Sequence, residues 1–285
     1  MECDGWVIHG NPGVFADAVR AHLEAAEAEN GLLLGILDSL AINPPDLPPL
    51  LVEWRSGGRT ACVALQRDSH LVVSRGEDVP WDRLAARLRE IGRSIPSVAG
   101  PPREAERMAE AWAEAQDPGQ RRTAFLRMDQ RIYRLTRVEE PPPVPGRLRP
   151  AEEGDVEGLV GWFHDFDREA APWEAPSRER IRENTRRRIV SQTMFLWEVG
   201  GVPVAAAALT RPTPKGITVN SVYTPPEHRR RGYATALVAA VSAEGLRRGK
   251  EFCVLYTDLA NPTSNSIYQK VGYRPLCDSR LYGFR

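Results

Sequence analysis

The residues best suited to chemistry form one short segment in the second half of the chain. The segment reads Arg229-Arg230-Arg231-Gly232-Tyr233-Ala234. A helix that begins near Gly232 has first-turn N–H groups without acceptors in the helix, and the small side chains of Gly232 and Ala234 leave those groups accessible. The helix dipole and the neighbouring arginines favour a negative charge at this point. The segment therefore predicts a binding site for a pyrophosphate or a similar anion.

A second segment follows about thirty residues later. It reads Asn261-Pro262-Thr263-Ser264-Asn265-Ser266-Ile267-Tyr268-Gln269-Lys270-Val271-Gly272-Tyr273. Together the two segments resemble the signature of the GNAT superfamily of acyl-CoA-dependent N-acyltransferases. In that signature, Gln or Arg is followed by two residues of any type and then by Gly-x-Gly/Ala, and an Asn is later followed by Tyr, Gly and an aromatic residue. The resemblance covers residues 147–285.

The resemblance implies a mixed α/β fold in which two neighbouring strands splay apart to admit the pantetheine arm of acetyl-CoA. Backbone groups of Val222 and Thr224 would bond the arm as an added strand does. Amides from residues 230–235 would hold the pyrophosphate, and Arg229 or Arg230 would meet the ribose 3′-phosphate. The expected cofactor-binding residues are Val222, Thr224, Arg229, Arg230, Arg231, Gly232, Tyr233, Ala234, Thr235 and Asn261. Asn261 equally suits the start of a helix.

The same resemblance implies direct attack of a neutral amine on the thioester, without a metal. A backbone N–H near Val222 would polarise the thioester carbonyl. Tyr268 matches the family's usual general acid, and its phenol is a plausible proton donor to a leaving thiolate. The alternative for Tyr268 is a core aromatic residue that packs one helical turn from Gly272.

The general base stays open. Six acidic or imidazole side chains are candidates: His164, Asp165, Asp167, Glu198, Glu227 and His228. Each is also a common surface group, so none is preferred. Asp165 and Asp167 would suit a cationic substrate.

Local patterns then supply the elements that must position these groups. In the second half, the expected order is two helices, three strands, a helix, a strand, a short helix and a last strand. The expected ranges are 154–171, 178–191, 194–199, 202–209, 217–223, 232–247, 252–257, 265–270 and 282–284. Alternating helices and strands of this kind predict a mixed α/β domain.

The first half repeats that order faintly, with strands expected at residues 50–54, 60–66 and 70–74 and a helix at 81–91. Its turn reads Ser74-Arg75-Gly76-Glu77-Asp78-Val79-Pro80-Trp81. Two acids would repel a pyrophosphate, and Pro80 lacks an N–H. We therefore expect tandem GNAT-like domains: a degenerate copy without cofactor at 1–140, a Pro-rich linker at 141–146, and a catalytic acetyltransferase domain at 147–285.

Composition narrows the classes of function that are still open. The chain has 285 residues, 38 basic and 38 acidic, so it lacks the basic excess usual for a nucleic-acid binder. Residues 1–146 carry 17 basic and 22 acidic side chains, and residues 147–285 carry 21 and 16. Four cysteines without CxxC spacing and a polar N-terminus predict a reduced, cytoplasmic protein with no membrane segment.

The expected function is transfer of an acetyl group from acetyl-CoA to a small-molecule or peptide amine. Neither the acceptor, the acyl length nor a homodimer follows from the sequence. A catalytically inactive CoA-binding sensor or scaffold is the alternative. A third class, nucleic-acid binding through residues 186–188 and 229–231, would show strong salt dependence.

Overall fold

The computed structural model describes residues 4–42, 45, 47–115, 122–174 and 176–285. The chain divides into two compact units. Unit 1 comprises Met1–Ile132, Thr257–Ala260 and Leu276–Arg285, and unit 2 comprises Tyr133–Tyr256 and Asn261–Pro275. This division differs from the predicted contiguous domains, because the last ten residues of the chain belong to unit 1.

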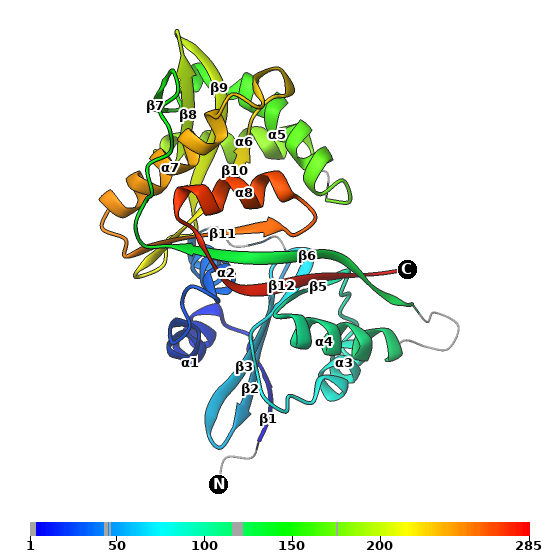
Figure 1. Ribbon diagram of the computed structural model, residues 1–285. Helices are drawn as coiled ribbons and strands as arrows, with labels where there is room; N and C mark the ends of the chain where they lie inside the picture. The colour runs from blue at the N-terminus through cyan, green and yellow to red at the C-terminus, as the bar shows by residue number, and fades with distance from the viewer. Residues whose placement is uncertain (1–3, 43–44, 46, 116–121, 175) are drawn as a thin grey trace. The chain divides into compact units, whose positions relative to one another are not determined.

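Unit 1 is built around the sheet order β1-β2-β3-β4-β5-β12 (Figure 1). The strands are β1 (Gly5–Ile8), β2 (Leu50–Ser56), β3 (Arg59–Gln66), β4 (His70–Val73), β5 (Ser97–Gly100) and β12 (Arg274–Phe284). Only β4 and β5 of this series run parallel. Residues 5–8 were not predicted as a strand.

Helices cover both faces of this sheet because its strands are apolar on both sides. The helices are α1 (Pro12–Glu24), α2 (Gly31–Ile42), α3 (Trp81–Glu90) and α4 (Pro102–Glu114). Leu51 and Val63 share a core with α1 and α2, whereas Val52 and Ala64 share one with α3 and α4. Neighbouring strand residues point to opposite faces, so each strand feeds both cores.

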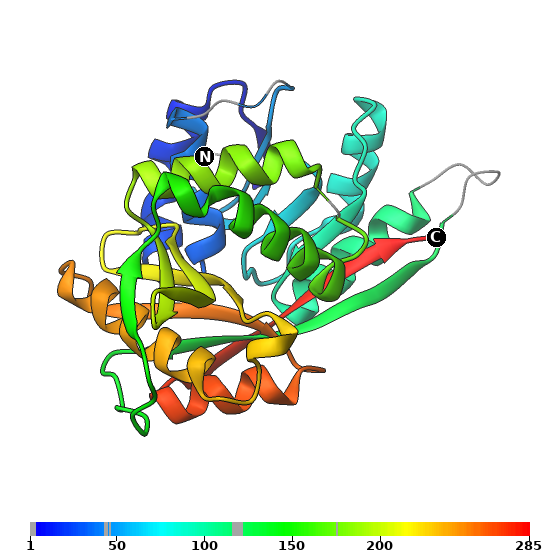
Figure 2. The same cartoon turned by 90° about the horizontal axis from the view of Figure 1, so that it is seen from above.

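Unit 2 has the sheet order β11-β10-β9-β8-β7. Its strands are β7 (Arg147–Pro150), β8 (Met194–Val199), β9 (Val202–Thr210), β10 (Gly216–Tyr223) and β11 (Phe252–Asp258, of which 252–256 lie in the unit). Its helices are α5 (Val156–Ala170), α6 (Arg178–Val190), α7 (Tyr233–Arg247) and α8 (Pro262–Val271). Helices α5 and α6 pack side by side (Figure 2). Short 3₁₀ turns lie at Glu153–Asp155 and Pro226–His228.

Side chains alternate along β9, so the cores they enter show which helices cover each face of the sheet in unit 2. Ala206 and Ala208 pack in a core with α5 and α6, whereas Ala205, Ala207 and Leu209 pack in one with α7 and α8. Both units thus show two helices, three antiparallel strands, a helix, a parallel strand and a helix. The predicted tandem mixed α/β fold is confirmed.

Two segments cross the predicted domain limits. Strand β12 pairs with β5 antiparallel, with Arg280 opposite Gly100, and its Leu281 and Tyr282 enter the two cores of unit 1. Strand β6 (Ala124–Leu135) begins in unit 1, but its Tyr133 belongs to the α7 core of unit 2. A division of the chain at 140 and 147 would therefore remove a strand from each unit.

The Pro-rich segment at 141–146 belongs to unit 2 and is held against it. The Trp197 indole N–H donates to the Pro145 carbonyl at 2.9 Å. Gly146 has φ 118°, and a Cβ there would lie 2.7 Å from the Glu198 carbonyl oxygen. Only glycine fits this left-handed, crowded position. The segment predicted as a spacer is thus packed on β8.

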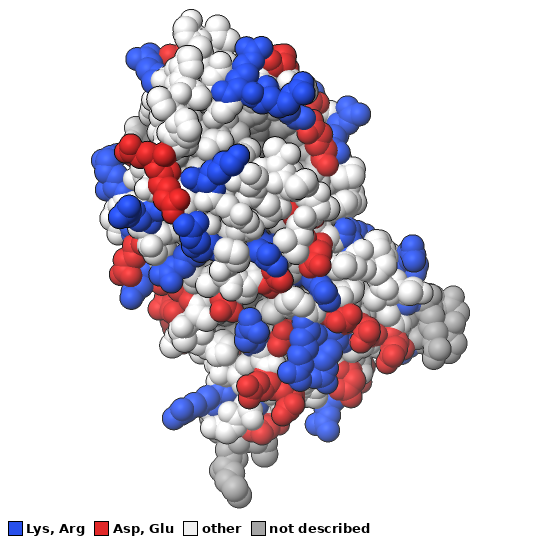
Figure 3. Space-filling model, viewed as in Figure 1, with Lys and Arg blue, Asp and Glu red and all other residues white. Residues whose placement is uncertain are grey.

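Two further observations concern membrane-spanning helices and the distribution of surface charge. Within the described residues, no helix combines the length and apolar character needed to cross a bilayer. Basic and acidic side chains are mixed over the face drawn in Figure 3.

We expect Leu281→Ala to lower the free energy of unfolding by about 2–5 kcal/mol, because it leaves a cavity in a closed core. Leu281 is 6% exposed and lies in the segment that completes unit 1. Leu126→Ala is the control: that side chain is 45% exposed, so the loss should stay within about 0.5 kcal/mol. Urea titration measures both. Equal losses would contradict the assignment of the C-terminal strand to the core of unit 1.

Candidate active site

Strands β10 and β11 of unit 2 separate part-way along their length. They pair in parallel from Gly216 to Thr218, opposite Phe252 to Val254, although both continue further. Burial falls at the same point: residues 216–219 are buried and residues 220–222 are half-buried. Unpaired backbone N–H and C=O groups need partners. The separated ends therefore offer hydrogen bonds to an extended ligand.

A β-bulge in β10 lies where the two strands separate. Asn220 pairs with Ala208 and Tyr223 with Ala206, so two residues of β10 face one residue of β9. Ser221 takes a left-handed φ of 52°, which is uncommon for residues other than glycine. Bulges turn the following backbone groups away from the regular ladder. Here the bulge interrupts the regular pairing with β9 at Ser221 and Val222.

The turn after β10 leads into α7 through two left-handed residues. Arg230 has φ 62° and Gly232, the N-cap, has φ 83°. No side chain caps this helix, and the first intrahelical bond from this end runs from Ala236 N–H to the Gly232 carbonyl. The N–H groups of Tyr233, Ala234 and Thr235 are therefore free of helical acceptors. Free N–H groups of this kind are what the predicted anion site requires.

The three arginines of the turn differ in their surroundings. Arg229 donates to the Thr224 carbonyl at 2.8 Å and pairs with Glu169 of α5 at 2.9 Å. Its guanidinium also lies 5.6 Å from the centroid of the Tyr223 ring. Arg229 thus fastens the turn to α5, whereas Arg230 and Arg231 are exposed beside the N-terminus of α7.

Two further polar atoms of this turn are buried and have no hydrogen-bond partner in the part of the chain that the structure describes. They are Thr224 Oγ1 and His228 Nδ1. Buried polar atoms are normally hydrogen-bonded. A ligand along the turn would supply the missing partner for Thr224.

Tyr268 lies on α8, in an aromatic group with Tyr133 and Tyr273 at centroid distances of 6.5 and 6.1 Å. The side chain is 8% exposed. Burial raises the pKa of its phenol to about 12, against a smaller lowering by the Ser264 hydroxyl. Tyr268 is therefore protonated at neutral pH, as a proton donor must be. Its packing role and its predicted chemical role are compatible.

Asn261 caps α8. Its Oδ1 accepts from the Ser264 N–H at 3.0 Å, which is the helix-starting role that the sequence allowed. The residue is exposed, and it immediately follows the stretch Thr257–Ala260 assigned to unit 1. The cap occupies its side-chain oxygen only.

Residues 158–273 match the model of the acetyltransferase (GNAT) family. They form a GNAT acetyltransferase domain. The match includes the bulge, the turn into α7 and the Asn261–Tyr273 segment. No curated protein is similar enough in sequence to be matched to the chain.

Solved structures resemble the whole chain, not the GNAT domain alone. A GCN5-related N-acetyltransferase from Sphaerobacter thermophilus is 19% identical with a TM-score of 0.63, over 97% of this chain and 94% of that one. A GNAT-family acetyltransferase from Colwellia psychrerythraea is 11% identical, with a TM-score of 0.58 and 98% of each chain covered. A tandem GNAT protein from the clavulanic acid biosynthesis pathway is 15% identical with a TM-score of 0.55, over 99% and 98%. These likenesses show a tandem GNAT fold.

The six candidate bases of the GNAT domain fall in different environments. Glu198 pairs with Arg149 at 2.5 Å and Arg147 at 3.0 Å, and these arginines lower its pKa. Asp167 is half-buried on α5, and burial followed by the charge of Glu174 raises its pKa. A base needs a pKa near the working pH, so the structure favours Asp167 over Glu198.

The structure gives less support to the remaining candidates for the general base. His164 Nδ1 lies 3.6 Å from Asp165 Oδ1 on the surface of α5. Glu227 is exposed, and His228 is half-buried in the turn. Sequence reasoning missed Arg211 and Thr218, and it considered Arg188 only within residues 186–188 as a possible nucleic-acid-binding segment. No motif identifies them, because their proximity arises from β9, β10 and α6 folding together.

Unit 1 has the same topology, but its parallel strands stay together. Strand β4 pairs with β5 from His70 to Val72, and a Cβ on Gly100 would lie 2.7 Å from the Val73 carbonyl oxygen. Glu77 and Asp78 are exposed in the following turn, and the Pro80 carbonyl accepts from the Trp6 indole. The turn of unit 1 therefore lacks the open strand ends of the GNAT domain, and its one arginine, Arg75, pairs with Glu29 at 3.2 Å.

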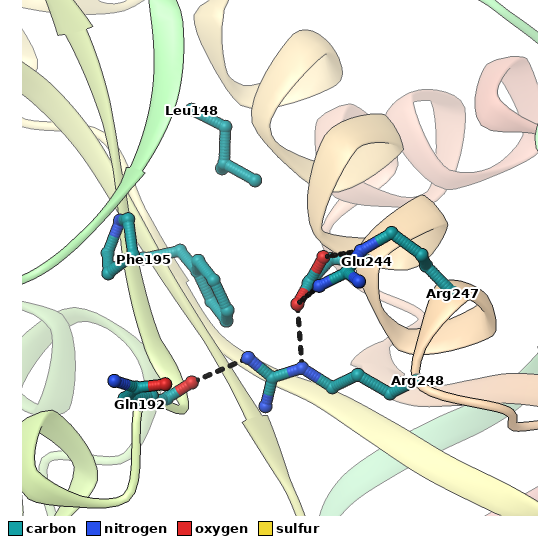
Figure 4. A pocket seen from close by; sticks show the side chains of 7 residues that line it. Leu148, Gln192, Phe195, Glu244, Arg247 and Arg248 are labelled. Atoms are coloured by element: carbon teal, nitrogen blue, oxygen red, sulfur yellow. Dashed lines mark hydrogen bonds and ion pairs between the residues drawn. The ribbon is translucent and has the colours of Figure 1, made fainter.

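A surface cavity of about 390 Å³ lies elsewhere in the GNAT domain (Figure 4). Its lining residues are Leu148, Pro150, Gln192, Phe195, Glu244, Arg247 and Arg248. Glu244 accepts from Arg247 at 2.7 Å and from Arg248 at 2.8 Å, and Arg248 also donates to the Gln192 carbonyl. Because its charges already satisfy one another, the cavity offers no free group for chemistry. Among the described residues, no group of three His, Cys, Asp or Glu side chains is placed to hold a metal ion.

The turn before α7 also packs against the Pro-rich segment, which yields a test. A Cβ on Gly232 would lie 2.9 Å from Val144 Cγ1, whereas a Cβ on Gly249, with φ 86°, would meet nothing within 4 Å. Gly249→Ala should cost about 1–2 kcal/mol of unfolding free energy from backbone strain alone. Gly232→Ala should cost about 1 kcal/mol more, because of overpacking against Val144.

When Val144 is already Ala, the further change Gly232→Ala should not show this extra loss of unfolding free energy. The comparison is between the double variant Gly232→Ala/Val144→Ala and Val144→Ala alone. Thermal or urea unfolding measures all four proteins. If Gly232→Ala and Gly249→Ala lose the same free energy of unfolding, the Pro-rich segment does not pack tightly against the turn.

Proposed function

We propose that the protein is an N-acetyltransferase that transfers the acetyl group of acetyl-CoA to the amine of a small-molecule or peptide acceptor. The observation that carries the proposal is the separation of β10 from β11 directly before the uncapped N-terminus of α7. One feature offers backbone hydrogen bonds to an extended arm, and the other offers N–H groups to a pyrophosphate. A cytoplasmic location and the absence of nucleic-acid and membrane partners remain predictions from the sequence.

The residues present fit acetyl-CoA. The turn combines free N–H groups, the exposed cations of Arg230 and Arg231, and a buried Thr224 hydroxyl without a partner. The pyrophosphate belongs at Tyr233, Ala234 and Thr235, and the pantetheine arm at Val222 and Thr224. We assign the 3′-phosphate to Arg230 in preference to Arg229, because Arg229 is already bound to Glu169 and Thr224.

Bound acetyl-CoA would supply a thioester to the acceptor amine: a C–N bond would form as the C–S bond breaks, with its electron pair leaving on sulfur. The backbone N–H beside Val222, at the bulge, would polarise the carbonyl. Tyr268 would donate its phenolic proton to the sulfur. Asp167, whose pKa burial raises, would take the proton that the amine nitrogen loses.

One site per chain follows from the contrast between the units. Acetyl-CoA binding needs the free helical N–H groups for the pyrophosphate and a neighbouring gap between parallel strands for the pantetheine arm. Unit 1 keeps β4 and β5 together and carries Glu77 and Asp78 in its turn. We therefore assign acetyl-CoA to unit 2 alone, and calorimetry should give one CoA per chain.

Ala234→Glu should weaken CoA binding at least about tenfold, or about 1.4 kcal/mol, because a carboxylate in the first turn of α7 repels the pyrophosphate. An acid at a helix N-terminus does not destabilise the helix, so the melting temperature should not fall. Ala234→Gln has a side chain of the same size without the charge and is the control. Calorimetry compares the three proteins. Unchanged affinity in the Glu variant would place CoA elsewhere.

Tyr268→Phe should lower turnover about 10²-fold, the low end for general acid catalysis, and change CoA affinity little. Tyr273→Phe is the matched control, since it removes a buried phenol hydroxyl that bonds Ser242 at 2.8 Å. Because the pKa of Tyr268 is about 12, its ionisation should not lower wild-type turnover below pH 10. Thiol release across an amine panel measures this.

Two outcomes would revise the assignment. Normal turnover in Tyr268→Phe would make the residue a packing residue only. CoA binding without thiol release from any amine would favour the sensor or scaffold.

A further inference from the structure

Two arginines of unit 2 are withdrawn from water without a carboxylate partner. Arg188 lies on α6, and Arg211 directly follows β9; both residues are half-buried. Burial lowers the pKa of both, that of Arg188 to about 10 with a further contribution from the charge of Arg211. Within the described chain, neither guanidinium forms an ion pair. Two cations held close together away from water are costly unless something compensates them.

Both guanidinium groups lie on the sheet face opposite α7. Arg188 Nη1 donates to Ser221 Oγ of the bulge at 3.0 Å, and the Arg211 guanidinium lies 5.6 Å from the centroid of the Tyr256 ring. Alternate residues of β10 and β11 pack in the core of α7. Thr218 and Tyr256 are adjacent in sequence to these core residues, so their side chains point to the other face of the sheet. We call Arg188, Arg211, Thr218 and Tyr256 the arginine cluster.

The arginine cluster contains donors without acceptors. Arg211 Nε and Thr218 Oγ1 are buried and have no hydrogen-bond partner among the described residues. Thr218 is only 1% exposed. Such groups are rare in folded proteins and call for an explanation. An acceptor-rich anion would satisfy both.

We propose that the arginine cluster binds an anionic group, carboxylate or phosphate, carried by the amine acceptor. This rests on the proposed acetyl transfer and names the class of its substrate. Arginine forks match the oxygens of both anions. The phosphates of acetyl-CoA already have their site at α7, whose core lies on the opposite face of the sheet.

The surroundings suit an acceptor with an amine as well as an anion. Helix α5, which carries Asp167, packs against α6 and β10, and the charges of Asp167 and Arg188 affect each other's pKa. Arg188 also holds the bulge through Ser221, which connects the anion to the backbone beside the thioester site. An anion bound here would place the attached amine near Asp167 and the bulge.

Matched acceptors test the proposal with the full-length protein and acetyl-CoA. The pairs are β-alanine with its amide, and phosphoethanolamine with ethanolamine. We expect kcat/KM for thiol release to favour the anionic member of one pair about 10–100-fold. The preferred pair identifies carboxylate or phosphate as the anion. Equal rates within both pairs would overturn the proposal.

Variants provide the second readout. Arg188→Gln and Arg211→Gln should each abolish the preference. Arg211→Gln should also raise the melting temperature by about 2–4 °C, because it removes a buried charge without an ion-pair partner. A purely structural role predicts a lower melting temperature and would overturn the proposal. Arg186→Gln, on the exposed side of α6 in a surface pair with Glu153, should do neither.

A third measurement does not depend on acetyl transfer. In the Ala234→Glu background the anion site at α7 is blocked, and inorganic phosphate should still raise the melting temperature. It should fail to do so when Arg211→Gln is added. A phosphate effect that survives Arg211→Gln would overturn the anion site. Thiol release from no amine, with the phosphate effect intact, would refute the acetyl transfer and leave the anion site standing.

Discussion

The structure of the GNAT domain depends on the point at which β10 stops pairing with β11. Up to Thr218 and Val254 the strands form an ordinary parallel pair in the core. Beyond it, the bulge at Ser221 turns the backbone outward, and burial decreases. The free N–H groups of α7 follow in the chain within a dozen residues. One interruption of a ladder therefore leaves backbone groups of β10 and β11 without each other as partners shortly before the uncapped N-terminus of α7.

Maintaining this interruption requires compensation from neighbouring elements. Ser221 adopts an unfavourable left-handed φ, and the Arg188 hydrogen bond holds its side chain. Arg229 fixes the following turn to α5 through Glu169, and Val144 packs on Gly232. This region thus contains a strained residue, donors without hydrogen-bond partners and buried cations, each of which is unfavourable for folding. Such features are expected where function competes with stability.

The sequence predicted the features that local chemistry determines. Gly232 and Ala234 indicated the start of α7 because their size acts within a few residues, and apolar periodicity predicted most helices and strands. Strands β1 and β7 were missed because both are four-residue edge strands with little alternation. The placement of β12 in unit 1 and the arginine cluster could not be predicted. They depend on pairing between residues such as Arg280 and Gly100, which are far apart in the chain.

The two units show how little separates an open site from a closed one. Both place a parallel strand pair before a helix, but Gly100 has no Cβ and so allows the Val73 carbonyl to approach. In unit 2 the corresponding strand continues with Leu255 and Tyr256, and the partner strand carries the bulge. Trp6 then closes the turn of unit 1 through Pro80. A shared topology thus leaves both outcomes available, and side-chain volume and one extra residue in β10 decide between them.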